Sequence, residues 1–269
     1  MPKSPSRRFS ETLTIALEEF AKYGYDSRSR LDYWMSRLRE AAMASLKSPE
    51  QIDEDVRVAL KQVSRRVLRK SPRYHRGLGR YAIQRVGNRL APELERRIMA
   101  SVDLIRLHRQ EAIDKTLQRF SGLATSLSPG TRTLDKREAK TQISKSLRQM
   151  NFEARRVVID QGHKLINAVN SVIAEDNGAI AAVWHSHWRQ PGYDYRPDHK
   201  ERDEQLYAVR GNWAITDGLM KPGHYLDEIT QPGQEVFCRC YVSYLYHLRD
   251  LPDDRLTKKG RQSLNPPEA

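Results

Sequence analysis

The sequence predicts an α+β protein, with a mainly α-helical N-terminal half followed by a small α+β domain with short strands. Up to Gly178, apolar residues recur at helical spacing. Beyond it, short apolar runs alternate with Pro-Gly pairs. Charge divides the chain in the same way. Residues 1–150 hold 32 Lys and Arg against 17 Asp and Glu, whereas residues 151–269 hold 15 against 17. This charge asymmetry predicts that the two halves have different functions and that the basic half contacts a polyanion.

Four helices are expected before residue 151. The first covers residues 10–24, where Leu13, Leu17 and Phe20 share one face. Ser48-Pro49-Glu50-Gln51 predicts the start of the second, because Ser48 and Gln51 can form a capping box. A long helix is expected to begin at Pro92 and to end in the Ser/Gly/Pro-rich stretch 121–131. The fourth is expected to run from Asp135 toward Met150.

In the second half of the chain, the spacing of the apolar residues changes. One more helix is expected from Asn151 to a stop at Asn177-Gly178, followed by a strand in 179–188. Short apolar runs at 213–215 and 241–245 predict further strands, and the polar residues after Leu251 are expected to be loose. The predicted regions are a basic helical region (1–126), a linker with a short helix (127–150), the α+β domain (151–250) and a polar tail (251–269).

The stretch from Val56 to Pro92 carries eleven Lys and Arg and no acidic residue. Solvated helix faces usually mix both charges, so this run predicts a counter-charge from outside the chain. Arginine dominates it, and a guanidinium suits two-pronged contact with phosphate. We expect salt-sensitive contact with the backbone of double-stranded DNA. Two alternatives stay open: an acidic protein surface, or a helical protein that simply favours arginine. The predicted contacts are Arg57, Lys61, Arg65, Arg66, Arg69, Lys70, Arg73, Arg76, Arg80 and Arg85.

The only two cysteines, Cys238 and Cys240, are one residue apart, so they cannot brace a fold as a disulfide. Together with His199 they form a candidate nitrogen and sulfur ligand set for a tetrahedral zinc. The alternative is that these three residues pack and hydrogen-bond in a small core. The candidates for a fourth ligand are Glu235, His185 and His187, the two histidines sharing one face of the expected strand.

Enzymatic activity is the alternative function. Titratable groups cluster in the loop around His199, as a metal-dependent hydrolase or an RNase-like toxin would need. The chain has no phosphate-binding glycine loop, no His-Glu-x-x-His and no nucleophile elbow, so we expect it not to be an enzyme. It also has no apolar run long enough for a membrane span, and its first residues lack the apolar core of a secretory signal. Synthesis in a cytoplasm is expected. The clustered groups are Asp194, Asp198, His199, Glu201 and Asp203.

Residues from about 150 to 246 resemble the phage Mu F-like, or phage head morphogenesis, domain of minor capsid proteins. A leading helix is followed by a tryptophan near the start of a strand, a Pro-Gly turn and a closing Cys-Arg-Cys. The chain departs from many members at Glu235-Val236-Phe237, where they have His-Pro-Asn. The motif residues of the resemblance are Asp194, Arg196, Pro197, His199, Cys238, Arg239 and Cys240.

The resemblance implies a minor head protein of a tailed bacteriophage, made in the host cytoplasm and located in the virion. Members act in head assembly, genome retention or ejection, at the portal vertex or with the packaged DNA. The implied partners are the portal protein, scaffold or capsid proteins and genomic double-stranded DNA, with no membrane. The alternative remains a nuclease or toxin-like enzyme with a His/Cys metal site.

Overall fold

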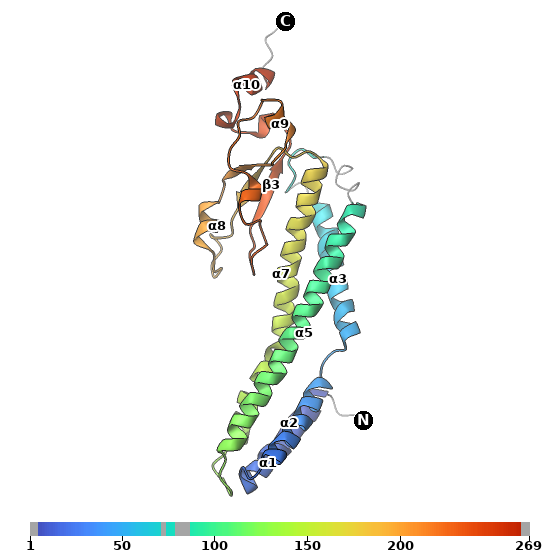
Figure 1. The fold of residues 1–269 in the computed structure, drawn as a ribbon, viewed down its shortest axis with the longest axis vertical. Helices are drawn as coiled ribbons and strands as arrows, with labels where there is room; N and C mark the ends of the chain where they lie inside the picture. Colours follow the sequence, from blue (N-terminus) through green and yellow to red (C-terminus); the bar gives the residue numbers. More distant parts are fainter. Residues whose placement is uncertain (1–4, 71–73, 79–86, 265–269) are drawn as a thin grey trace. The chain divides into compact units, whose positions relative to one another are not determined.

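The computed structural model of the chain describes residues 5–70, 74–78 and 87–264 (Figure 1). Its contacts form two compact units. Unit 1 comprises Met1–Asp55 and Ser101–Val157, and unit 2 comprises Val56–Ala100 and Val158–Ala269. The α+β class is confirmed, because long helices accompany one three-stranded antiparallel sheet in unit 2. The units do not follow the predicted regions, since three long helices each pass from one unit into the other: α3 (Pro49–Lys70), α5 (Gly87–Ser126) and α7 (Lys145–Asp176).

Unit 1 is helical. It contains α1 (Pro5–Tyr23), α2 (Arg28–Met43) and α6 (Lys136–Ile143), with the unit 1 parts of α5 and α7. Its core includes Leu17, Phe20 and Leu38 together with Phe120, and the Phe20 and Phe120 rings meet edge to face with centroids 5.8 Å apart. Asp135 caps α6 by accepting from the backbone N–H groups of the second and third helical residues, as its position predicted.

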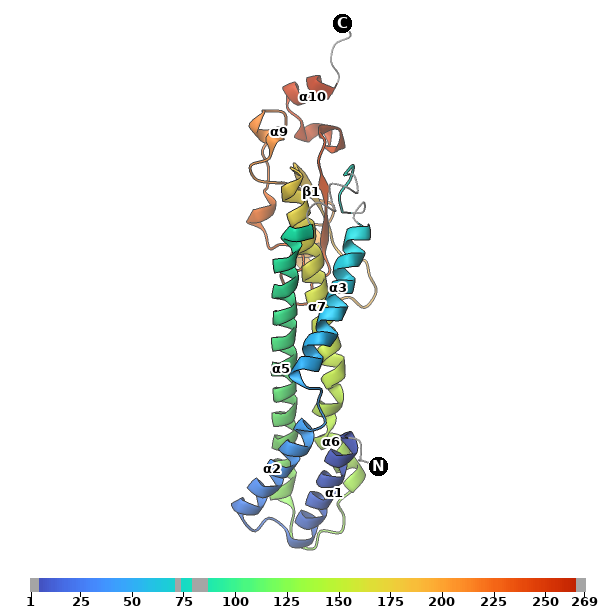
Figure 2. The same ribbon diagram turned by 90° about the vertical axis from the view of Figure 1, so that its right-hand side faces the viewer.

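The long helices of unit 2 are the remaining parts of α3, α5 and α7, which lie side by side in both ribbon views (Figures 1 and 2). The Val63 side chain of α3 lies beside Gly162 of α7, and Arg57 on α3 bonds to Glu95 on α5. The predicted capping box of α3 is confirmed, because the Ser48 hydroxyl accepts from Gln51 N–H at 3.2 Å and Gln51 Oε1 accepts from Ser48 N–H at 3.0 Å.

The sheet has the order β2-β1-β3, with β1 (Ala181–His185) between β2 (Leu206–Ala208) and β3 (Tyr241–Leu245). Successive side chains of β1 point to opposite faces. Ala182 and Trp184 pack in one core with Ala174 of α7, whereas Ala181 packs in a second core on the opposite face. Residues 74–76 lie along the free edge of β3, where the Tyr244 N–H donates to the Tyr74 carbonyl at 2.7 Å.

Three boundaries differ from the predictions. α5 begins at Gly87 rather than at Pro92, so Pro92 is the sixth residue of the helix, where its missing N–H removes one backbone hydrogen bond. α7 is continuous from Lys145 through residues 150 and 151, where a break was expected. The run 213–215 forms a helical turn, α9 (Trp213–Thr216), and not a strand, because the Asn212 side chain caps it by accepting from Ile215 N–H.

The expectation of a loose tail is wrong for residues 251–264. After η3 (Leu248–Asp250), the chain forms η4 (Asp253–Arg255) and α10 (Lys258–Leu264). Leu251 and Leu256 are buried in the second core, which covers one face of the sheet. Gly260 lies against the Leu219 carbonyl, where any side chain would overlap it. The apolar side chains of this segment, and not its polar composition, decide its packing. Residues 265–269 lie outside the described residues.

Candidate metal-binding group

His199, Cys238 and Cys240 come together in unit 2, as their residue types predicted. His199 lies on α8 (Pro197–Glu201), and the two cysteines precede β3. The His199 Nδ1 atom lies 3.7 Å from Cys238 Sγ and 3.5 Å from Cys240 Sγ. His199 is 2 % exposed and each cysteine 1 %. Among the described residues this is the one group of His, Cys, Asp and Glu whose donor atoms lie close enough to hold a metal ion.

Local sequence features place these side chains. Pro197 occupies the first turn of α8, and the His199 ring meets the fully buried Trp184 with centroids 5.5 Å apart. Gly233 has φ +78°, and a Cβ there would lie 2.8 Å from the Asn167 side chain of α7. Only glycine combines that φ with so close an approach to the helix. The Gly233 N–H donates to Cys238 Sγ at 3.4 Å, so the close approach delivers a donor to the sulfur.

The two thiols differ in acidity because they share a hydrogen bond. The hydrogen bond that Cys240 donates lowers the pKa of Cys238. Burial acts in the opposite direction, and backbone N–H groups and His199 add to the lowering. The same shared bond and burial raise the pKa of Cys240. The arrangement favours one thiolate in the pair, and a thiolate is the form that binds metals.

Glu235, a predicted fourth ligand, lies on the other side of the histidine ring. Its Oε2 atom is 2.7 Å from His199 Nε2 without the alignment of a hydrogen bond, and 3.3 Å from Arg196 Nε. The Nδ1 atom faces the sulfurs and Nε2 faces the carboxylate, so Glu235 is placed to orient the ring rather than to join the two cysteines. A carboxylate on the far nitrogen is the usual outer partner of a metal-binding histidine.

His185 and His187, the other predicted fourth ligands, are not in the group. His185 is one residue after Trp184 on β1, so it points to the opposite face of the sheet. There it bonds to the Ser243 hydroxyl at 3.0 Å and stacks on Tyr241 at 4.8 Å. His187 follows the end of the strand and lies 6.2 Å from the same Tyr241 ring. The sequence located the strand but not which of its faces meets the cysteines.

The remaining motif residues surround the group unevenly. Arg196 donates to the Val236 carbonyl at 3.1 Å, and the Arg239 backbone N–H donates to the Tyr193 hydroxyl at 3.1 Å. Asp194 is exposed and makes no such contact within the described residues. Sequence reasoning missed Tyr193 and also Asp160, whose carboxylate accepts from Phe237 N–H at 2.6 Å. Asp160 lies on α7, far from the motif in sequence, and no local pattern marks it.

Two carboxylates of the cluster behind the enzyme alternative, Asp198 and Asp203, make local contacts. Asp203 accepts from Trp188 Nε1 and from Ser186 N–H, both at 2.8 Å. Asp198 pairs with Arg202 at 2.7 Å. Two of the predicted acidic groups are therefore engaged in local contacts.

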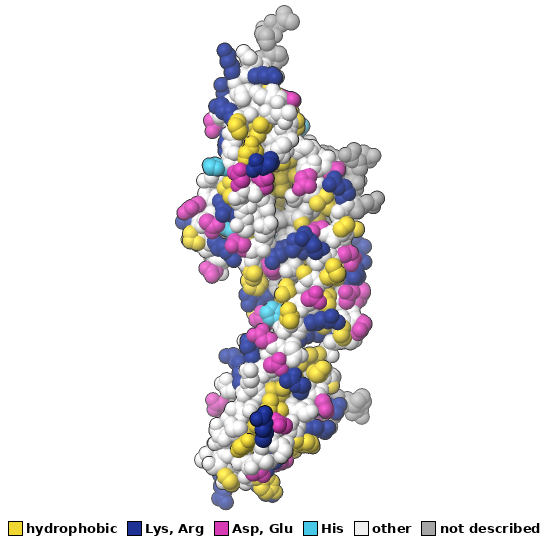
Figure 3. Space-filling model, in the orientation of Figure 1, with side chains coloured by type: hydrophobic (Ala, Val, Ile, Leu, Met, Phe, Trp, Pro, Cys, Tyr) yellow, Lys and Arg dark blue, Asp and Glu magenta, His cyan; other side chains and the backbone are white. Residues whose placement is uncertain are grey.

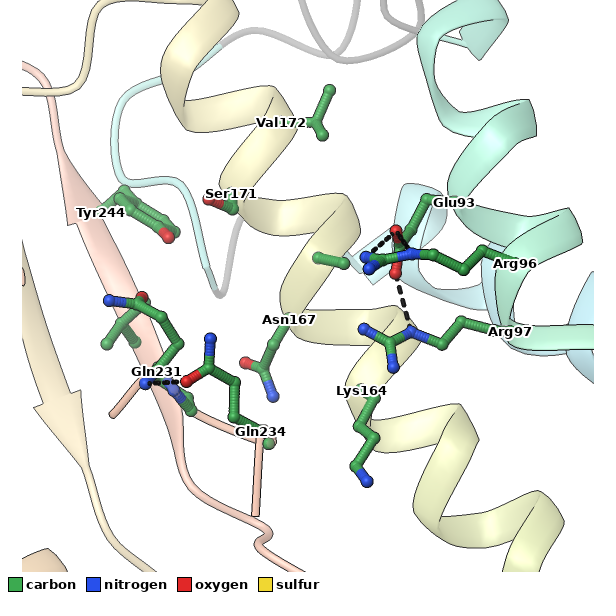
Figure 4. A pocket seen from close by; sticks show the side chains of 14 residues that line it. Glu93, Arg96, Arg97, Lys164, Asn167, Ser171, Val172, Gln231, Gln234 and Tyr244 are labelled. Carbon is green, nitrogen blue, oxygen red and sulfur yellow. Dashed lines mark hydrogen bonds and ion pairs between the residues drawn. The ribbon is translucent and has the colours of Figure 1, made fainter. Parts of the chain in front are cut away.

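A pocket of about 270 Å³ lies behind the cysteine loop, between α5, α7 and residues 231–234 (Figure 4). It touches the group through Gly233 and through Asn167, which donates to the Cys240 carbonyl at 3.2 Å. Its cationic side chains have carboxylate partners within the chain, because Glu93 bonds to both Arg96 and Arg97 and Asp160 pairs with Lys164. Figure 4 shows Glu93 turned toward the two arginines, across from the amides of the loop.

The basic run is partly neutralised from within the chain. Arg57 bonds to both oxygens of Glu95 at 2.6 and 2.9 Å, and Arg89 pairs with Asp176, so these two need no outside counter-charge. Both acids are distant in sequence, which is why the run looked unpaired. On the face in Figure 3, basic and acidic side chains are interspersed. The exposed residues among the predicted DNA contacts are Lys61, Arg65, Arg66, Arg69 and Arg76. Arg73, Arg80, Arg85 and the side chain of Lys70 lie outside the described residues.

No helix in the described ranges is both long and apolar enough to cross a membrane. Comparison with protein-family models, with curated proteins and with solved structures finds no match to this chain.

Proposed function

We propose that this chain is a minor head protein of a tailed bacteriophage, with an α+β region that a bound zinc ion stabilises and with no enzymatic activity. The observation that carries the proposal is the convergence of His199, Cys238 and Cys240 in one buried group. Arg196 and Glu235 flank that group, and Arg196 belongs to the same motif. These residues come from two segments about forty positions apart, and the resemblance to the phage head morphogenesis domain rests on those two segments.

The donor set supports zinc in particular. A tetrahedral zinc with Zn–N of about 2.1 Å and Zn–S of about 2.3 Å holds nitrogen and sulfur roughly 3.6 Å apart. The Nδ1 to Sγ distances of 3.5 and 3.7 Å match this spacing. When bound, the ion would link α8 to the strand that follows the cysteines, and Glu235 would hold the ring that carries the nitrogen ligand.

The alternative is a nuclease or toxin-like enzyme, and one observation favours it: three protein ligands leave a fourth position open, as in catalytic zinc sites. Burial weighs against it, because all three ligands are almost fully covered and a substrate would have to displace the loop. An assay for cleavage of RNA and DNA decides between them. Activity that disappears in a folded His199→Ala variant would support the enzyme.

Elemental analysis of the purified full-length chain tests the metal. We expect about one zinc per chain, lost in Cys238→Ser and in His199→Ala. His185→Ala is the matched control, since His185 lies on the opposite sheet face and should leave zinc content unchanged. A wild-type protein purified without chelators that contains no zinc, and takes up none when it is added, would contradict the proposal.

Mass spectrometry of purified virions tests the location. We expect the chain among the low-copy head components, together with portal and capsid proteins. Its absence from particles with a full set of head proteins would reject the virion assignment.

The exposed part of the basic run makes DNA the proposed polyanion. Binding of the purified protein to duplex DNA of any sequence is expected to fall steeply with salt. The charge-reversed variant Arg65→Glu should bind more weakly than Arg57→Glu, which changes the net charge equally, because Arg57 is already engaged by Glu95. Equal losses in the two variants would point to a nonspecific effect of net charge.

A further inference from the structure

Unit 1 contains a pocket of about 630 Å³ between α1, α5, α6, the first turns of α7 and residues 45–47. That volume lies in the range of ligand-binding pockets, roughly 300–1,000 Å³. Four large apolar side chains line it: Phe9, Leu46, Leu147 and Met150. Five cationic side chains line it as well: Lys47, Arg109, Arg137, Lys140 and Arg148. Within the described part of the chain, no Asp or Glu is among its lining residues.

The chain neutralises little of this positive charge. Lys47 pairs with Asp55, and Arg109 donates to the Lys47 carbonyl at 3.1 Å. Lys140 donates to the Thr14 hydroxyl at 3.0 Å, which is a neutral partner. Arg137 and Arg148 are exposed and have no carboxylate partner among the described residues.

Burial lowers the pKa of Arg109 against the attraction of Asp55, so the pocket holds at least one partly desolvated guanidinium. An anionic occupant would therefore gain charge-assisted hydrogen bonds at groups that the fold leaves unpaired. The same occupant would also cover the apolar side chains between those groups.

We propose that this pocket binds an acidic segment of a partner protein, anchored by one large apolar side chain. The cationic rim fits carboxylates, and the apolar lining between the cations fits an aliphatic or aromatic anchor, which is the usual pairing at the centre of a protein interface. A nucleic-acid backbone fits less well. It would gain from the rim but would leave the apolar lining uncovered, and the one aromatic lining residue, Phe9, is buried at 5 % exposure and offers no stacking face.

Fluorescence anisotropy with the full-length protein tests the proposal. The probe is a short labelled peptide of Glu and Asp with a central Phe-Leu pair, compared with the same peptide carrying Ala-Ala. We expect saturable binding of the first peptide and at least about tenfold weaker binding of the second, because the anchor loses its apolar contacts. An unlabelled DNA duplex is the competitor that distinguishes a phosphate site.

Arg148→Glu should weaken binding of the Phe-Leu peptide by about tenfold or more, since it replaces attraction by repulsion at the rim of the pocket. Arg132→Glu is the matched control: Arg132 is exposed in the same unit, does not line the pocket, and makes the same change in charge. Met150→Gln tests the apolar lining without touching the unit 1 core. Equal binding of the two peptides, equal losses for Arg148→Glu and Arg132→Glu, or displacement by the duplex at lower concentration than by unlabelled peptide would each overturn the proposal.

Discussion

His75 should make unit 2 lose stability in mildly acidic solution. Its side chain is 1 % exposed and stacks on Tyr244. Nε2–H donates to Asn170 Oδ1 at 3.2 Å, which leaves Nδ1 to accept from the Tyr246 hydroxyl at 2.6 Å. No carboxylate contacts the ring within the described residues, and burial lowers the pKa of His75 from 6.5 to about 4. The folded protein therefore holds this histidine without charge.

The magnitude follows from that shift. Above pH 6.5 both the folded and the unfolded chain carry a neutral His75, so the group has no effect on stability. As the pH falls from 6.5 toward 4, His75 becomes protonated in the unfolded chain but stays neutral in the folded chain, so the free energy of unfolding decreases. The full loss below pH 4 is roughly 3 kcal/mol, of which about 2.5 kcal/mol is reached at pH 4.5.

Urea unfolding at pH 7 and pH 4.5, followed by tryptophan fluorescence, measures this loss. Three of the four tryptophans, Trp184, Trp188 and Trp213, lie in unit 2. The control variant is His75→Gln, which cannot titrate. Burial also lowers the pKa of His163, so the wild type loses stability from more than one group, and the difference between the two proteins isolates His75. The reasoning is refuted if both proteins lose the same stability between the two pH values.

Three further predictions concern the fold. Gly233→Ala should lower the free energy of unfolding by about 1–3 kcal/mol and lower the metal content, because a Cβ there combines a left-handed φ with overlap on α7. Gly192 has a φ of +73° but open space around it, so Gly192→Ala should cost less in the same urea unfolding measurement. Ser48→Ala should cost about 1 kcal/mol by the same measurement, since it removes half of the capping box of α3. Phe120→Leu should cost roughly 1–3 kcal/mol in thermal unfolding through loss of the edge contact with Phe20, and an unchanged midpoint would contradict that assignment.

The sequence predicted features that depend on local chemistry. The capping box of Ser48 and Gln51 and the cap at Asp135 are each formed within four residues, and both were found. The stop at Gly178 was also correct, and its φ is +66°. Proline was less informative: Pro92 lies inside α5 as its sixth residue, and not at the first helical position, where a proline is best tolerated.

Features that depend on distant contacts could not be predicted in this way. The acids that neutralise Arg57 and Arg89 lie on other helices, at Glu95 and Asp176. The fourth-ligand candidates show the same limit. Alternation placed His185 on one face of β1, but which face meets the cysteines is decided by α7, whose Ala174 packs with Trp184 and Cys240 on the other. The trio itself was predictable, because cysteines are so scarce here that their placement near a histidine carries information.

The size of the sheet explains what a metal would contribute. Its strands are only five, three and five residues long, and a sheet this small depends on what covers it. One face is covered by α7 and the other by residues 214–220 and 248–256, which pack through Met220, Leu251 and Leu256. In residues 193–205, which carry α8, His199 is the one buried residue, and its ring contacts the Trp184 ring, the two sulfurs and Glu235. An ion held by His199 and both cysteines would fix this segment to the core at its buried residue.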